Sequence, residues 1–374
     1  MAIVFNKPAF LGTELSAIAE ALQVNFHAAG GGPFTRRCEE LLQQMLGLRS
    51  LLVTSATHAL EMTAHLLNVK PGDEIILPSF TFVSTANAFV LRGAKPVFAD
   101  VDAGGNLDLN EVARLITPKT RAIVPVHYAG NSCDMHALHQ VAGGIPLVED
   151  AAQAIGAAFA GQPLGTFGAL AAFSFHETKN VGCGEGGALI IRDPALVERA
   201  EYYRDKGTNR SRFLEGLVDK YTWVDVGSSP VLSEVSAAYL STQLEQVPRI
   251  LARRREIWDR YDAKLGPAME KVGGYVIRPH SRNQPNGHLF ALVFSAPVHR
   301  AGFIAHMKRA GIVTPFHYVA LHLSPMGRGF HDGRSLPRTE QLSSCLVRLP
   351  IFFNMLDSEV DTVIGRALEF LSSL

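Results

Sequence analysis

Residues 72–102, GDEIILPSFTFVSTANAFVLRGAKPVFADVD, place a short apolar run on each side of a segment long enough for a helix. The two runs, at 73–78 and 95–101, have the length and the β-branched content of strands. The intervening segment, 81–93, has the length that a crossover between two parallel strands requires. This order of strand, helix and strand predicts an α/β fold.

The same alternation continues along the chain. Apolar runs at 121–128 and 145–150 flank the helical pattern DMHALHQVAG. The runs at 169–175 and 187–192 follow with little between them, which leaves no room for a helical crossover and marks a local departure from the alternation. We therefore expect a mostly parallel sheet with helices on both faces.

A change of pattern near Ser233 suggests a second domain. There a long helical stretch begins and runs through EVSAAYLSTQLEQVPRILARRREIWDRYDAKL, and shorter strand and helix patterns follow it. A chain of 374 residues is long enough for two cores. We expect a large domain over residues 1–240 and a small C-terminal α+β domain over residues 241–374.

Composition excludes several classes of partner. The 35 basic and 35 acidic side chains cancel, so no overall field favours nucleic acid or an anionic membrane. The four cysteines are scattered without the paired spacing of a zinc site, and we expect reduced thiols and no metal. The N-terminus lacks the apolar core of a signal peptide, and no run reaches the ~18 apolar residues of a membrane span, which predicts a cytoplasmic protein.

Polar residues at strand ends are the candidates for chemistry, because ligands of open α/β sheets collect at the carboxyl ends of strands. Asp150 follows the apolar run IPLVE, and Gln153 comes three residues later. Such an acid either caps a helix or pairs with the protonated ring nitrogen of a pyridoxal cofactor. In LLVTSATHALEM, residues 55–57 stand where a strand gives way to a helix, a position that suits an anion site or simple helix capping.

The stretch FSFHETKN, residues 173–180, adds a lysine after an apolar strand. Lys179 is either a solvated surface lysine or an amine that forms a Schiff base with an aldehyde cofactor. Ser174 is either a small core hydroxyl or a phosphate ligand. An acid at one strand end, a hydroxyl and a lysine at another, and a helix start for phosphate together indicate a pyridoxal 5'-phosphate enzyme.

Several motifs also resemble a known family. TSATHALEM, ITPKTRAIVPVHYAG, VEDAAQAIGA, FSFHETKN and the stretch at 72–102 are similar, in order and spacing, to the DegT/DnrJ/EryC1/StrS sugar aminotransferases. The resemblance covers nearly the whole chain. It implies the fold-type I architecture of pyridoxal phosphate-dependent aminotransferases and a homodimer with active sites at the subunit interface.

The resemblance also implies residue roles. Lys179 would be the Schiff-base lysine, Asp150 the partner of the ring nitrogen, Phe82 the stacking partner of the ring and Gln153 the neighbour of the ring hydroxyl. The phosphate would be bound by Ala56, Thr57 and Ser174. Where many members have G-x-N-x-R, with the asparagine reaching the phosphate of the neighbouring subunit, this chain has GSSPV at 227–231. Ser229 would take the role of that asparagine.

Finer motifs, among them GGGPFTRRCEELL, DKYTWVDVGSSPVLSEVSAAYL and FHYVALH, resemble members of the family that act on dTDP-linked sugars. They imply transfer of an amino group from L-glutamate to carbon 4 of dTDP-4-dehydro-6-deoxy-D-glucose, giving dTDP-4-amino-4,6-dideoxy-D-galactose for cell-surface polysaccharide. We expect basic residues to meet the diphosphate and two histidines to line the sugar entrance. These candidates are Arg210, Arg212, Lys206 and Lys220, and His317 and His322.

Other functions are compatible with parts of this pattern. A NAD-dependent sugar oxidoreductase is also an α/β protein, but it needs a G-x-G-x-x-G turn that neither GIPLVED nor GEGGALI supplies. A non-catalytic regulator could bind the same cofactor, although an intact Lys179, Asp150 and Ser174 argue against it. Within the enzyme class, another keto sugar, amination at carbon 3 or dehydration remains open.

Overall fold

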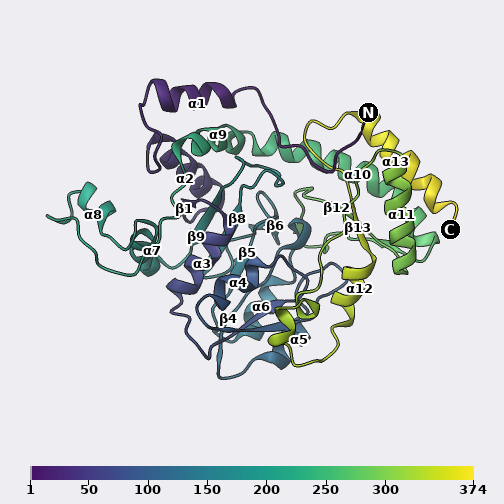
Figure 1. Ribbon diagram of the computed structural model, residues 1–374, viewed down its shortest axis with the longest axis horizontal. Coiled ribbons are helices and arrows are strands. Elements are labelled where there is room, and N and C mark those ends of the chain that lie inside the picture. Colours follow the sequence, from purple (N-terminus) through teal and green to yellow (C-terminus); the bar gives the residue numbers. More distant parts are fainter. Residues whose placement is uncertain (1) are drawn as a thin grey trace.

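The computed structural model describes residues 2–374, and its centre is a seven-stranded sheet (Figure 1). Parallel bridges from Ile123 to Leu147 and from Val126 to Asp150 join a three-stranded and a four-stranded part into the order β3-β2-β4-β5-β8-β9-β1. The strands are β1 (Arg49–Val53), β2 (Glu74–Pro78), β3 (Lys95–Ala99), β4 (Thr120–Ile123), β5 (Val148–Asp150), β8 (Leu170–Ser174) and β9 (Gly187–Ile191).

The predicted strand directions are confirmed. β2 pairs in parallel with β3 and β4, and β5 pairs in parallel with β8. β9 alone runs against its neighbours β8 and β1, because the short connection from Phe175 to Gly186 turns the chain directly back. The carboxyl ends of β1, β2, β5 and β8 consequently meet at one edge of the sheet.

Helices cover both faces of this sheet, as the alternating pattern requires. Along β1, Leu52 faces one hydrophobic cluster while Leu51 and Val53 face another, which is the period-two alternation of a strand buried on both sides. The first face is covered by α1 (Glu14–Gln23), α2 (Pro33–Leu46), α5 (Leu109–Leu115), α6 (Met135–Ala142) and α9 (Glu234–Glu245), and the second by α3 (Ala56–Leu66), α4 (Ser84–Val90) and α7 (Val197–Arg204).

The C-terminal part has its own sheet and core. An antiparallel sheet in the order β10-β12-β13 packs with three helices around a cluster that includes Tyr261, Phe290 and Phe303. These elements are β10 (Tyr275–Val276), β12 (Phe290–Val293), β13 (Leu346–Leu349), α10 (Val247–Lys271), α11 (Pro297–Arg309) and α13 (Asp357–Leu371). A further helix, α12 (Pro337–Cys345), packs in a separate cluster. A small sheet of β11 (Asn283–Gln284), β6 (Ala158–Phe159) and β7 (Gln162–Pro163) connects this part to the first.

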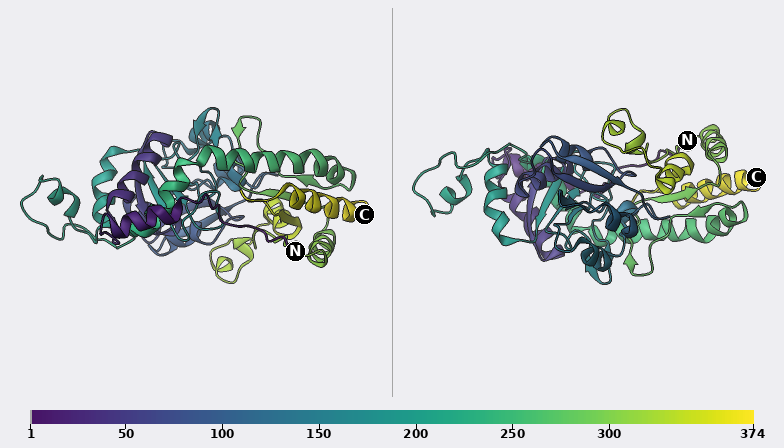
Figure 2. Two further views of the ribbon diagram at one scale, coloured as in Figure 1. Left: turned by 90° about the horizontal axis from the view of Figure 1, so that it is seen from above. Right: turned by 90° about the horizontal axis from the view of Figure 1, so that it is seen from below.

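Two details differ from the sequence prediction. The long helix expected from Ser233 is interrupted at Gln246 between α9 and α10, because Pro248 has no N–H with which to continue the helical hydrogen bonds. The N-terminal segment lies with the C-terminal part (Figure 2): Ile3 pairs with Ile312 and belongs to the C-terminal cluster. The division of the chain at residue 240 remains our proposal, with this segment as an addition to the second unit.

Within residues 2–374, no helix combines the length and the apolarity that crossing a membrane requires.

Candidate active site

A cavity of about 530 Å³ lies at the edge where the carboxyl ends of the strands meet, and both parts of the chain line it. It brings together residues from Phe5 to Ile351, which are 346 positions apart in the sequence. The predicted residues that line it are Ala56, Thr57, Phe82, Asp150, Gln153, Ser174, Lys179 and His317.

Asp150 is the last residue of β5 and is only 6% exposed. Its Oδ2 accepts a hydrogen bond from the Thr85 hydroxyl at 2.7 Å, and its Oδ1 accepts one from the Ala152 N–H at 3.2 Å. Thr81 and Thr85 hydrogen-bond through their hydroxyls at 2.8 Å. The strand and the two hydroxyls thus hold the Asp150 carboxylate in one orientation at the cavity. A partner for a protonated ring nitrogen must be held in this way.

Lys179 lies in the turn between β8 and β9. The Phe175 N–H donates to the Gly186 carbonyl, and the Cys183 N–H donates to the Phe175 carbonyl. These backbone hydrogen bonds close the turn and place Lys179 in the cavity wall. Burial lowers the pKa of its ammonium below the ordinary 10.5, while the Asp150 carboxylate opposes the shift and Arg348 adds to it. A larger fraction of this amine is therefore neutral near pH 7 than for a solvated lysine, which suits a nucleophile and base.

The start of α3 suits a phosphate. Ser55 adopts an extended conformation and caps the helix by accepting the His58 N–H, so the capping explanation holds for this residue. The N–H groups of Ala56 and Thr57 belong to the first turn, which has no intrahelical acceptors for them. A Cβ on Gly187 would lie 2.3 Å from the Ser55 carbonyl carbon, so a glycine is required where β9 passes the helix start. Backbone donors and the nearby Ser174 and Thr57 hydroxyls form a site of the kind that binds phosphate.

Gln153 and Phe82 also line the cavity. The Gln153 Oε1 accepts the Ala129 N–H at 2.8 Å, and its Nε2 donates to the Tyr318 hydroxyl at 3.1 Å. The Phe82 side chain is 58% exposed and lines the cavity. The cavity thus combines a carboxylate, an amine, donors for a phosphate and an open aromatic face. This set of groups fits pyridoxal phosphate.

The two candidate histidines differ in position. His317 lines the cavity and stacks on Tyr318 with ring centroids 3.8 Å apart. Burial, with smaller contributions from Arg348 and Lys179, lowers the pKa of His317 to about 2, so its ring is neutral at physiological pH. His322 does not line this cavity, because it is buried beneath the surface with its Nδ1 2.7 Å from the Ser79 hydroxyl.

The remaining predicted residues lie outside the cavity of their own chain. Arg210 and Arg212 belong to α8 (Arg210–Leu214), which projects away from the rest of the chain (Figure 1). Arg212 pairs with Glu198, and Ser229 is exposed. Lys206 and Lys220 do not line the cavity either. In the single chain, none of these residues lines the cavity that contains Lys179.

Several residues of the site were not predicted. The His288 Nδ1 lies 2.9 Å from the Asn180 Oδ1, and Asn286 donates to the Gln153 carbonyl at 2.8 Å. Arg254 of α10 donates to the carbonyl groups of residues 287 and 288 at 3.1 and 2.7 Å. The contacts of His288 and Asn286 join segments more than 100 positions apart, and those of Arg254 join residues 33 and 34 positions apart. None of them leaves a local pattern in the sequence. Arg348 did leave one, as a single charge in the apolar run CLVRLPIFF.

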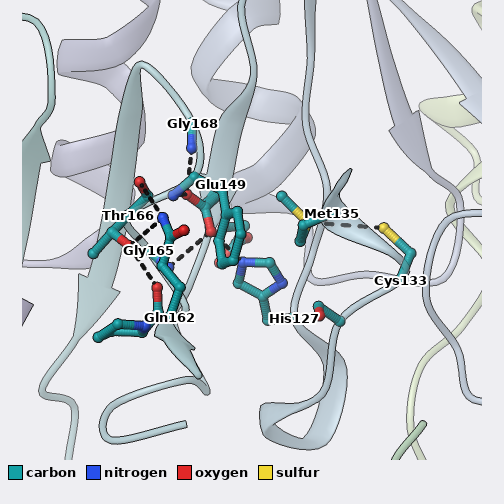
Figure 3. Close-up of polar contacts among 12 residues, drawn as sticks. His127, Cys133, Met135, Glu149, Gln162, Gly165, Thr166 and Gly168 are labelled. Atoms are coloured by element: carbon teal, nitrogen blue, oxygen red, sulfur yellow. Dashed lines mark hydrogen bonds and ion pairs between the residues drawn. The ribbon is translucent and has the colours of Figure 1, made fainter. Parts of the chain in front are cut away.

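Glu149, next to Asp150, is fully buried and, because side chains alternate along a strand, faces the other side of β5. Figure 3 shows its polar contacts. Its Oε1 accepts the N–H groups of Phe167 and Gly168 at 2.7 and 2.6 Å, and its Oε2 accepts that of Gly165 at 2.7 Å. The His127 Nε2 lies 2.7 Å from Oε2. This carboxylate ties the turn before β8 to the end of β5, and so fixes the strand that carries Asp150.

Replacing Glu149 by glutamine should destabilise the protein by about 3–5 kcal/mol, because an NH₂ group would then face two buried donors. We expect the thermal midpoint of the apoenzyme to fall by roughly 5 °C. Differential scanning calorimetry measures this shift, with the exposed Glu20 changed to glutamine as the control. An unchanged midpoint for Glu149→Gln would contradict the role given to this carboxylate.

Comparisons with known proteins point to one family. The model of the DegT/DnrJ/EryC1/StrS aminotransferase family matches residues 11–367. The aminotransferase TlmJ of Streptoalloteichus hindustanus is 32% identical, with a TM-score of 0.90 over 100% of this chain and 99% of that one. DesV of S. venezuelae, solved in complex with a ketimine intermediate, is 32% identical, with a TM-score of 0.88 over 96% and 95% of the two chains.

A sugar aminotransferase described as putative, Spr1654 of Streptococcus pneumoniae, is 25% identical in its PLP form. Its TM-score is 0.89 over 100% of this chain and 99% of that one. The family match covers most of the sequence, and the cavity holds the groups that pyridoxal phosphate needs. This chain therefore belongs to the DegT/DnrJ/EryC1/StrS aminotransferase family and is a pyridoxal phosphate-dependent aminotransferase.

Proposed function

We propose that the protein is a dTDP-4-amino-4,6-dideoxygalactose transaminase, which moves an amino group from L-glutamate to carbon 4 of dTDP-4-dehydro-6-deoxy-D-glucose. The observation that carries the proposal is that one cavity contains Lys179, Asp150 and a phosphate site, and has His317 from the motif FHYVALH in its wall. This motif is among those that resemble transaminases of this specificity. We place the reaction in the cytoplasm, in the supply of sugars for cell-surface polysaccharide.

The residues of the cavity have separate tasks in this reaction. When bound, pyridoxal phosphate supplies an electron sink for the carbon that loses a proton. Lys179 would carry that proton, because its amine has a lowered pKa and lines the same cavity as Asp150. The Asp150 carboxylate would keep the ring nitrogen protonated, and the start of α3 with Ser174 would hold the phosphate.

We also propose a homodimer in which each subunit completes the other's site. The segment around α8 exposes Leu214, Leu217 and Trp223, the last of which is 78% exposed. Apolar side chains on a projecting segment suit a protein interface better than solvent. In such a dimer Ser229 would contact the cofactor phosphate, and Arg210 and Arg212 the nucleotide diphosphate, of the other subunit.

The substrate assignment is tested by incubating the holoenzyme with L-glutamate and dTDP-4-dehydro-6-deoxy-D-glucose. We expect one molecule of 2-oxoglutarate for each amino sugar, and proton NMR couplings that place an axial amine on carbon 4. The 3-keto isomer serves as the matched control and should react far more slowly. Amination at carbon 3, or an equatorial amine, would overturn the assignment and leave the aminotransferase activity intact.

A further inference from the structure

Arg348 of β13 is a cation without an anionic partner in the wall of the active-site cavity. Its Nη2 donates to the Phe316 carbonyl at 3.1 Å. Within residues 2–374, its Nε and Nη1 make no hydrogen bond, and no carboxylate lies within ion-pair distance of it. Arg254, the buried arginine of the same cavity, differs because its donors are used by two backbone carbonyl groups.

The surroundings hold this guanidinium in place. Its strand pairs with β12, where Arg348 lies opposite Ala291. The Phe5 ring covers one face of the guanidinium at 4.4 Å from the ring centroid. Phe5 is held in turn because Ile3 donates to the Gly311 carbonyl and accepts the Val313 N–H. A partly buried guanidinium that lacks an anionic partner costs free energy, so its fixed position indicates a ligand.

The neighbours of Arg348 locate that ligand near the reacting atoms. Arg348, Lys179 and His317 line the same cavity, and the Arg348 Nη2 donates to the carbonyl of Phe316, the residue before His317. In agreement with this placement, the charge of Arg348 contributes to the lowered pKa values of Lys179 and His317. In an amino acid, the α-carboxylate is one bond from the carbon that loses its proton to Lys179. In a sugar nucleotide, the diphosphate is attached at carbon 1, across the pyranose ring from carbon 4. A cation beside Lys179 therefore matches the carboxylate better than the diphosphate.

We propose that Arg348 binds the α-carboxylate of the amino-acid donor and is a specificity-determining residue for the first half of the reaction. Arginine suits this task because its planar fork of N–H groups matches a carboxylate and stays charged when buried. The proposal rests on the proposed function only in taking L-glutamate as the donor. A sugar substrate lacks this carboxylate and should not depend on the interaction.

The test measures the two half-reactions separately in the holoenzyme. Stopped-flow absorbance follows the loss of the visible cofactor band as L-glutamate is varied. For Arg348→Gln we expect the half-saturating glutamate concentration to rise about 10- to 100-fold, as loss of a charged hydrogen bond implies. Arg348→Lys should recover part of this loss. The enzyme loaded with pyridoxamine phosphate should react with the keto sugar within about twofold of wild type.

A binding measurement complements the kinetics. Succinate is a dicarboxylate that cannot react, and its dissociation constant can be read from its effect on the visible band. We expect about 10-fold weaker binding by Arg348→Gln. The matched control is Arg300→Met, since Arg300 packs on the Phe316 ring and donates to the Ser343 carbonyl without lining the cavity. Its glutamate and succinate affinities should equal those of wild type.

The outcomes are distinguishable. Unchanged glutamate saturation in Arg348→Gln, or an equal loss in both half-reactions, overturns the proposal. A loss confined to the sugar half-reaction also overturns it and assigns Arg348 to the diphosphate. If wild type reacts with glutamate but aminates a different sugar, the substrate assignment fails while the glutamate measurement still decides the role of Arg348.

Discussion

Replacing Lys179 by alanine should lower kcat by about 10³-fold or more, because it removes the cavity amine that we propose carries protons to and from the reacting carbon. Its position explains the size of this effect. The turn from β8 to β9 holds the amine in a buried setting that lowers its pKa, and no other lysine among residues 2–374 lines this cavity.

The measurement is turnover of L-glutamate to 2-oxoglutarate by purified protein, together with the visible absorbance of the bound cofactor. Lys179→Ala should lose both the turnover and the absorbance maximum that depends on its bond to the cofactor. Lys119, which is exposed on a loop, gives the control Lys119→Ala with unchanged values. Full turnover by Lys179→Ala would refute the assignment of this lysine.

Replacing Asp150 by asparagine should lower kcat by about 10³-fold with little change in the fold. A neutral amide can still accept the Thr85 hydrogen bond, so the packing at the end of β5 is kept. The lost feature is the negative charge that we propose pairs with the ring nitrogen, and breaking a buried charge pair costs about 3–5 kcal/mol. The effect should therefore appear in catalysis.

Two further variants separate charge from position. Thr85→Val removes one hydrogen bond to Asp150 and keeps the charge, so a loss of only about 10-fold is expected. The exposed Asp219, changed to asparagine, should behave as wild type. Steady-state kinetics with L-glutamate and the keto sugar compare all three. An Asp150→Asn enzyme as active as Thr85→Val would show that its charge is not needed.

Local sequence patterns predicted the central sheet well. The runs around 72–102 became β2, α4 and β3, and the short connection after residue 175 produced the antiparallel strand β9. These features depend on the alternation of apolar residues and on the length of connections, which neighbouring residues determine. The interruption at Gln246 was missed although it too is local, because Pro248 was read as part of a continuous helix.

The strand-end rule predicted much of the site for the same reason. Asp150, Ser174 and Lys179 follow apolar strands, and parallel strands end at one edge of a sheet. Knowing the order of elements was therefore enough to expect these side chains at one cavity. The rule does not apply to His322, which looked equivalent to His317 in sequence but is turned into the core against Ser79.

The sequence by itself determined the α/β class and the strand directions. It also determined the lysine, the acid and the helix start that suit the cofactor. Each of these features depends on residues that are close together in the sequence. Only the tertiary structure decided which distant groups complete the cavity. Arg348, His288 and Arg254 reach it from the C-terminal part, and Phe5 from the N-terminal segment. Their contacts arise from packing between separate layers, and packing at such sequence separations leaves no periodic pattern to read.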